Sequence, residues 1–298
     1  FTRLKPEKVE GAATAINELG SEQQKQELLP KIVAGELLVA LALDENSSHA
    51  PSRIHTSAER SGDGFILNGA KTFVLDGHVA QKLIVVARNS DEIDSKQGIG
   101  LFLVDATLEG IAINRTHMVD SRNSAKIEFS QVEVGADALL GEADGGFDGL
   151  DRVLDIARIG LAAEMLGSIQ EVFERILDFL KTREQFGILI GSFQGLQHRA
   201  ATMYSEIELC KSVVRAALAG LDDPAKSRED IAELASIAKA KLSEVFFEVS
   251  NEGIQMHGGI GMTDEFDIGF FLKRARVAQQ FLGDISFHRD RYASLNNF

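Results

Sequence analysis

The sequence predicts an α+β protein, with an antiparallel β-barrel or sandwich domain followed by a C-terminal four-helix bundle. Between residues 37 and 134, apolar residues form short blocks or alternate with polar ones, which is typical of strands. From residue 141 onward they recur at helical spacing. No helical pattern separates the strands, which favours antiparallel pairing. The predicted divisions are residues 1–36, 37–140 and 141–298.

Composition narrows the class of function. The 298 residues are 44% hydrophobic and 26% charged, with a formal net charge of -14. That charge argues against binding to nucleic acid or to an anionic membrane, but a local basic cluster could still bind an anionic small ligand. The single cysteine, Cys210, falls on an apolar helical face and is expected in the core. No stretch approaches the roughly 20 apolar residues of a membrane span and no signal peptide is visible, so a cytoplasmic location is expected.

Two helices are predicted first. Apolar residues within 8–20 share one face and Gly20 suits a C-cap, while Ser21 and Gln24 form a capping-box pattern for a second helix that ends near Pro30 or soon after it. The apolar run 37–43 predicts a buried strand.

Further strands and then helices follow in order. The predicted strands are 64–67, 71–75, 83–87, 101–104 and 126–134, with Asn68-Gly69 predicting a hairpin between the first two. The predicted helices run from about 150 to 180, 194 to 220 and 227 to 257, with a fourth from Ile268 and a short last one over 284–295. Long helices with short connections imply an antiparallel bundle.

Several motifs stand out against this framework. The connector Lys181–His198 carries Arg183, Phe186, Phe193 and Gln194, more chemistry than a plain turn needs. Together with the sequences at 68–71 and 255–261, it resembles the acyl-CoA dehydrogenase family over nearly the whole chain, and most resembles bacterial heteromeric or small-subunit members. The resemblance also implies that the family's N-terminal helical domain is mostly missing.

The resemblance implies FAD as the cofactor. Arg183 would bond the pyrophosphate, Phe186 would pack on the adenine end, and Gln194 would bond along the dinucleotide, in each case on a flavin held by a neighbouring subunit. Phe193 is a further expected cofactor contact. Without the resemblance, a solvated arginine and core phenylalanines would be expected.

A second implied contact lies after the third bundle helix. Gly258 and Gly259 would allow close backbone approach to a phosphate, and Gln255 would add a side-chain contact. A helix C-cap is the alternative reading of the glycines. His257 is expected to be structural.

The β domain departs from the family pattern. Asp44 begins a sequence where relatives commonly read Thr-Glu-Pro, and Phe73-Val74-Leu75 replaces Trp-Ile-Thr. Phe73 keeps an aromatic surface for the flavin ring. Asp44 could bond a ring N–H, but its carboxylate would repel negative charge developing on the ring.

The acid that the family uses to remove the α-proton is missing from its usual positions, which align with Leu282 and Ala157. Asp284 is the nearest alternative acid, or else the N-cap of the last helix. Arg158 matches a family arginine near the active site, or pairs with Asp155 on its own helix.

The implied function is flavin-dependent α,β-dehydrogenation of an acyl-CoA thioester, with electron-transferring flavoprotein as acceptor. The chain would form a homodimer, a homotetramer or a heteromer with a second acyl-CoA dehydrogenase-like chain. The alternatives are a non-catalytic partner or structural subunit without its own base, and a flavin monooxygenase on the same fold.

Overall fold

The computed structural model describes residues 6–90, 92–93, 95–143 and 145–298, with side chains from Gly11 onward. It divides into two compact units, one reaching to Ala157 and the other running from Arg158 to Phe298. The longest helix, α3 (Gly146–Thr182), passes through this boundary. The predicted three-part division stays a prediction, and its first five residues lie outside the described part of the chain.

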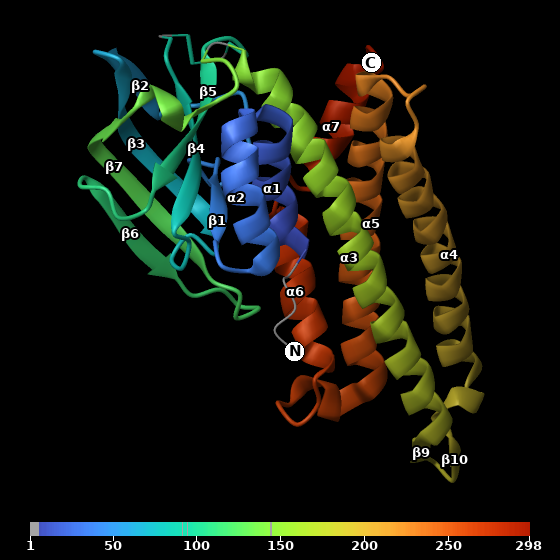
Figure 1. Cartoon of the computed structure of the whole chain (residues 1–298). Coiled ribbons are helices and arrows are strands. Elements are labelled where there is room, and N and C mark those ends of the chain that lie inside the picture. Colours follow the sequence, from blue (N-terminus) through green and yellow to red (C-terminus); the bar gives the residue numbers. More distant parts are fainter. Residues whose placement is uncertain (1–5, 91, 94, 144) are drawn as a thin grey trace. The chain divides into compact units, whose positions relative to one another are not determined.

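The first unit begins with α1 (Pro6–Leu19) and α2 (Glu22–Ala34), as predicted (Figure 1). Ser21 caps α2 through a complete capping box with Gln24. The helix continues past Pro30 and ends at Gly35, which takes the left-handed conformation of a C-cap (φ 76°).

One eight-stranded sheet makes up the β domain. Its strands are β1 (Val39–Ala42), β2 (Ser57–Ser61), β3 (Gly64–Leu75), β4 (Lys82–Arg88), β5 (Ile99–Asp105), β6 (Ile111–Thr116), β7 (Ser124–Val134) and β8 (Leu139–Leu140). The order is β6-β7-β3-β2-β4-β5-β8, with β1 beside β4. The β domain is confirmed, but the sheet does not close into a barrel. It is also not wholly antiparallel, because β4 pairs in parallel with β1 and β2.

The hairpin predicted at Asn68-Gly69 is wrong. Strand β3 runs straight through it, pairing with β2 on one side and β7 on the other. The register slips between Leu67 and Gly69, and Asn68 Oδ1 accepts a hydrogen bond from the backbone N–H of Gln131 (2.8 Å). Asn68-Gly69 therefore forms a bulge instead of a turn, because the two neighbouring strands hold the chain extended.

The second unit is a helical bundle, as predicted. It contains most of α3, followed by α4 (Gln194–Asp222), α5 (Arg228–His257), α6 (Ile268–Gln280) and α7 (Ile285–Leu295) (Figure 1). The inward residues of α4 follow the predicted spacing. One of them is Cys210, and burial raises the pKa of its thiol to about 12, which confirms a core cysteine. No helix in the described ranges has both the length and the apolar character needed to cross a membrane.

Candidate functional site

The connector singled out in the sequence is a β-hairpin at the tip of the bundle. Strands β9 (Glu184–Gln185) and β10 (Ile188–Leu189) pair antiparallel, joined by Phe186 and Gly187. Both turn residues have positive φ (56° and 76°), as a two-residue type I′ turn requires. Phe186 is 89% exposed, and its ring meets that of Phe193 edge-on at 6.2 Å between centroids. An apolar aromatic surface is thus presented to solvent.

Polar groups beside this hairpin are available to a ligand. The Arg183 guanidinium is exposed and makes no hydrogen bond or ion pair with any residue that the structure describes. Gln194, the first residue of α4, is exposed as well, and the α4 N-cap Phe193 supplies no side-chain bond to the open N–H groups. A cation beside an uncapped helix N-terminus favours an anionic group.

The glycine pair of the second motif is open on its outer face. Gly258 ends α5 with φ 64° and ψ -141°, a conformation that favours glycine. A Cβ placed on Gly258 or Gly259 would have nothing within 4 Å. Gln255, on the last turn of α5, is exposed. The backbone here can be approached closely by a ligand.

An aromatic stack brings the two motifs to the same end of the bundle (Figure 1). The rings of Phe179, near the end of α3, and His257, at the end of α5, lie 4.3 Å apart, and Phe266 packs 5.3 Å from His257. His257 Nδ1 lies 2.7 Å from the backbone oxygen of Gly253, and burial lowers the pKa of the imidazole. His257 is therefore structural, as expected.

The residues predicted to face the flavin ring lie together in the β domain. Asp44 follows β1, and its backbone oxygen accepts a hydrogen bond from the N–H of Thr72 (2.7 Å). The next residue, Phe73, has a left-handed backbone (φ 53°). The Asp44 carboxylate is not isolated, because His49 Nδ1 lies 2.9 Å from Asp44 Oδ1. His49 belongs to no motif, so it could not be singled out from the sequence.

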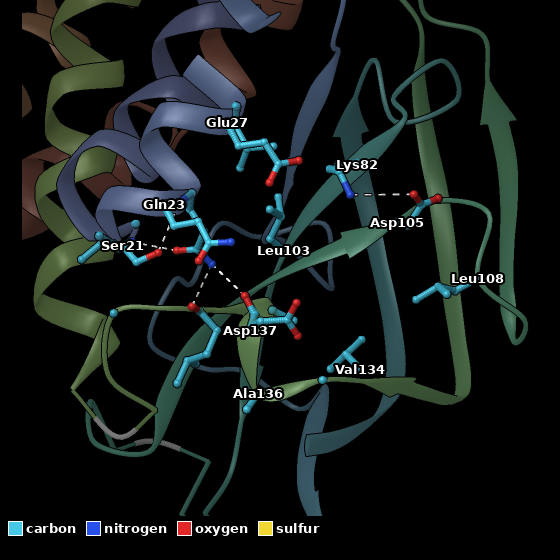
Figure 2. Close-up of a pocket in the computed structure, with 18 of the residues that line it drawn as sticks. Ser21, Gln23, Glu27, Lys82, Leu103, Asp105, Leu108, Val134, Ala136 and Asp137 are labelled. Atoms are coloured by element: carbon cyan, nitrogen blue, oxygen red, sulfur yellow. Dashed lines mark hydrogen bonds and ion pairs between the residues drawn. The ribbon is translucent and has the colours of Figure 1, made fainter. Parts of the chain in front are cut away.

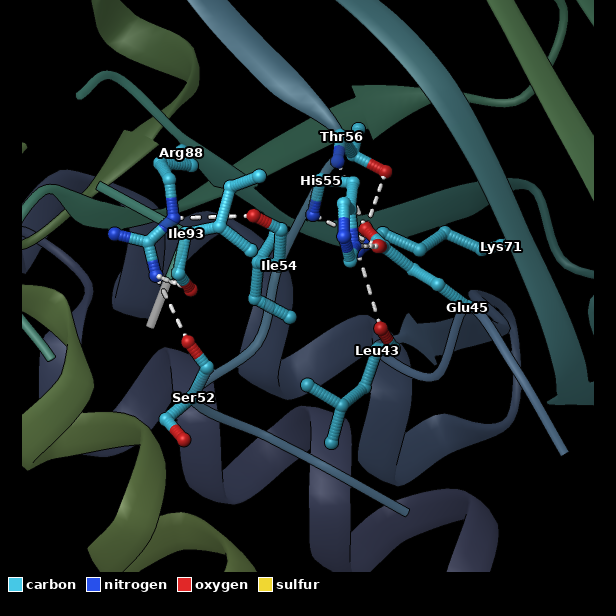
Figure 3. A network of polar contacts seen from close by, with 9 residues as sticks. All are labelled: Leu43, Glu45, Ser52, Ile54, His55, Thr56, Lys71, Arg88 and Ile93. Atoms are coloured by element: carbon cyan, nitrogen blue, oxygen red, sulfur yellow. Dashed lines mark hydrogen bonds and ion pairs between the residues drawn. The ribbon is translucent and has the colours of Figure 1, made fainter. Parts of the chain in front are cut away.

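Behind this edge lies a network of buried charges (Figure 3). Lys71 is fully buried and donates to Glu45 Oε1 (2.8 Å) and to the backbone oxygen of Leu43 (3.1 Å). Thr56 donates to Glu45 Oε1 through its N–H and hydroxyl, and His55 bonds Oε2. Burial alone would raise the pKa of Glu45, but the Lys71 ammonium and the bonds from Lys71 and Thr56 lower it to about 2.

Arg88 forms a second group of hydrogen bonds next to this network (Figure 3). Its guanidinium donates to the backbone oxygens of Ser52, Ile54, Ile93 and Ser95 at 2.7–3.0 Å. These bonds fix the segment that leads into Thr56 and so hold the partners of Glu45 in place.

The two positions where an acid was expected are apolar and packed. Leu282 is 4% exposed, in the turn between α6 and α7, with φ 60°. Its backbone oxygen accepts hydrogen bonds from Arg158 Nε (3.3 Å) and His288 Nε2 (3.0 Å). Arg158 is fully buried, which leaves it no surface for a ligand, so we assign it to the fold instead of to substrate binding. Ala157 offers only a methyl group.

Asp284 has the capping role that the sequence left open. Its Oδ1 accepts the N–H of Phe287 at 2.8 Å, at the start of α7. Lys239 holds the same turn by donating to the backbone oxygen of Gly283 (2.8 Å). Burial and the nearby Arg158 lower the pKa of Lys239 to about 7, against the opposing effect of Asp284.

A cavity of about 680 Å³ in the first unit is a poor candidate for an anionic cofactor (Figure 2). It lies between α2 and the sheet, and its lining includes Glu27, Asp105, Glu133 and Asp137. Its one lysine, Lys82, lies 3.8 Å from Asp105. This balance of charge would repel phosphate.

The chain thus combines a β domain with a helical bundle whose tip carries donors suited to an anionic ligand, the arrangement expected of a dinucleotide-binding protein of this class. The chain belongs to the acyl-CoA dehydrogenase family: the model of the family's middle domain matches residues 41–132 and that of its C-terminal domain matches residues 144–294.

Named relatives carry several activities. A 3-(aryl)acrylate reductase from Clostridium sporogenes is 30% identical, covering 87% of this chain and 68% of its own. Mitochondrial isovaleryl-CoA dehydrogenase from Pongo abelii is 32% identical (88% and 63%). A subunit of the caffeyl-CoA reductase–Etf complex from Acetobacterium woodii is 29% identical (87% and 68%).

A solved structure of a family member has a similar fold. The glutaryl-CoA dehydrogenase from Mycobacterium smegmatis in complex with FADH2 matches with a TM-score of 0.88 at 25% identity, over 96% of this chain and 73% of its own. The chain spans 62–71% of the length of the curated relatives it matches.

Proposed function

We propose that this chain is a subunit of an FAD-dependent acyl-CoA dehydrogenase, acting in the α,β-dehydrogenation of an acyl-CoA thioester. One observation carries the proposal. The exposed Arg183, whose guanidinium bonds no residue that the structure describes, lies beside a helix start without a side-chain cap, at the bundle end that also carries the open Gly258–Gly259 backbone. These are the donor types that an anionic pyrophosphate needs. Family membership makes FAD the natural candidate.

The roles of the bundle residues follow from their chemistry. Arg183 would bind the pyrophosphate, while Phe186 and Phe193 would cover the adenine end. Gln194 and Gln255 would hydrogen-bond along the dinucleotide. The flavin ring of bound FAD would supply the hydride acceptor for the reaction. Because all these side chains point out into solvent, we infer that they serve a flavin held mainly by a neighbouring subunit.

The acid for α-proton removal is expected from a second, non-identical chain of the same family. Leu282 and Ala157 have no acidic group, and Asp284 spends one carboxylate oxygen on the α7 N-cap. The electron acceptor would be electron-transferring flavoprotein, in keeping with the relative from the caffeyl-CoA reductase–Etf complex. A cytoplasmic location remains a prediction from the sequence.

The test is co-purification with the products of neighbouring genes, then measurement of FAD per chain and of anaerobic flavin bleaching by a series of acyl-CoA thioesters. We expect bleaching only when a second, acid-bearing chain is present. Full bleaching by this chain alone, lost in Asp284→Asn, would instead make Asp284 the base. A preparation that never binds flavin, alone or with a partner, would overturn the proposal.

A matched pair of variants at the packed turn sharpens the test. Leu282→Glu places a carboxylate at the family's usual position, whereas Leu282→Gln has the same shape and no acid. General bases contribute about 10²- to 10⁴-fold to rate. We expect flavin bleaching by acyl-CoA in the Glu variant only, provided that both variants keep the thermal stability of the parent.

A further inference from the structure

The edge of the β domain that carries Asp44 and Phe73 has the backbone features of a ligand-facing edge. Strand β3 slips register against β7 between Lys71 and Val74, and Phe73 within that bulge is left-handed. Thr72 ties the bulge to Asp44 through a 2.7 Å backbone bond. Bulges and left-handed non-glycine residues cost free energy and concentrate at functional sites.

Asp44 and His49 form a close pair at this edge. The Nδ1–Oδ1 distance is 2.9 Å, and the side chains are only 4% exposed for His49 and 15% for Asp44. Because the acceptor is a carboxylate, Nδ1 carries the proton and donates it. A carboxylate this far removed from water needs such a donor.

Two neighbouring charges, Glu45 and Lys71, are matched to each other. Lys71 Nζ lies 2.8 Å from Glu45 Oε1, and His55 Nδ1 lies 3.0 Å from Glu45 Oε2. Lys71 is near enough to feel the charge of Asp44, but its hydrogen bonds go to Glu45 and Leu43. The N–H of His49 therefore offsets the Asp44 carboxylate directly, whereas the hydrogen bonds of the Lys71 ammonium go elsewhere.

We propose that His49 is a positioning residue that offsets the Asp44 carboxylate at the flavin-facing edge of the β domain, and thereby raises the reduction potential of a flavin bound there. This rests on the proposed FAD-dependent function. A flavin gains negative charge as it is reduced, so an uncompensated carboxylate beside the ring disfavours the reduced form. A neutral hydroxyl facing the ring would need no such partner, whereas the Asp44 carboxylate needs the donor that His49 provides.

The test compares His49→Gln with His55→Gln in the flavin-loaded complex. Both variants replace an imidazole that bonds a carboxylate through Nδ1, but His55 is 55% exposed and serves Glu45. The midpoint potential of the flavin is measured at the same fixed pH in the parent and in every variant. We expect His49→Gln to make reduction at least tenfold less favourable, about 30 mV for a two-electron couple, and His55→Gln to leave it unchanged.

Adding Asp44→Asn to His49→Gln should restore the parental potential, since no carboxylate remains to offset. A structural role alone would not give this reversal. Flavin that binds with a potential indifferent to His49→Gln and to Asp44→Asn would overturn the inference while leaving the proposed function intact. Absence of any visible flavin absorbance in the parent complex would instead count against the proposed function itself.

Discussion

Two regions of this molecule treat their polar side chains in opposite ways. In the β domain, Glu45 and Lys71 are buried and bonded to each other and to their surroundings. At the tip of the bundle, Arg183 and Gln194 are exposed, and no hydrogen bond or ion pair joins the Arg183 side chain to any described residue. Charged groups therefore stabilise the fold in the first region, whereas in the second they are accessible to a ligand.

The largest expected effect breaks the buried side of this comparison. Lys71→Met removes the ammonium and leaves Glu45 buried beside an apolar side chain. Breaking a buried pair in this way costs about 3–5 kcal/mol, measured as the free energy of unfolding in urea. Lys82→Met is the control, because Lys82 faces Asp105 near the surface at 3.8 Å, where a pair contributes about 0–1 kcal/mol. Equal losses in the two variants would contradict the buried-charge account.

Acid should weaken the same network in a defined pH range. The pKa of Glu45 is about 2 in the folded chain against 4.5 for an unperturbed glutamate. Its contribution is thus fully present above about pH 4.5 and is lost as the pH falls toward about 2. We expect a loss on the order of 2–3 kcal/mol across this window, seen as the difference in unfolding free energy between the parent and Glu45→Gln. A difference that stays constant with pH would disprove the assignment.

The ligand side of the comparison is probed by Arg183→Ala. A charged hydrogen bond to a phosphate contributes about 1.5–3 kcal/mol, so FAD should dissociate about ten- to 150-fold more readily from the assembled protein. Stability should be unchanged, because no described residue bonds the side chain. Arg215→Ala, at an exposed position on α4, is the control and should keep flavin affinity. Equal affinities in the two variants would remove Arg183 from the site.

The smallest effect is expected for Phe186→Ala. The ring is 89% exposed, so its removal should change the unfolding free energy by no more than about 0.5 kcal/mol. Flavin retention should nevertheless fall several-fold, because the apolar surface proposed for the adenine is lost. Leu209→Ala, at a 55% exposed position on α4, should affect neither quantity. A large loss of stability in Phe186→Ala would instead make the ring part of the fold.

The helices were predictable because their apolar spacing repeats over many turns. Residues 194–220 and 227–257 were placed within a few residues of α4 and α5. Strand β2, at Ser57–Ser61, was missed because it is mostly polar and pairs through its backbone. The Asn68-Gly69 turn signal failed for a related reason: two neighbouring strands outweigh a two-residue preference.

Some residues of the candidate site could likewise be found from the sequence and others could not. Arg183, Phe186 and Gln194 could be singled out because they lie within one short connector. Asp44 could be found as a departure from the family pattern, but its pairing with His49 could not, since a spacing of five residues in a loop carries no signal. The burial of Lys71 and Arg158 was equally invisible, because long basic side chains are mostly expected at the surface.

The sequence by itself determined the order of elements, the family, and the absence of an acid at positions 282 and 157, because these depend on local pattern and residue type. Only the tertiary structure decided which charges are spent within the fold and which face outward, since that depends on contacts between segments far apart in the chain. Glu45 and Lys71 lie 26 residues apart and meet only in the folded β domain, whereas the Arg183 side chain bonds none of the residues that the structure describes.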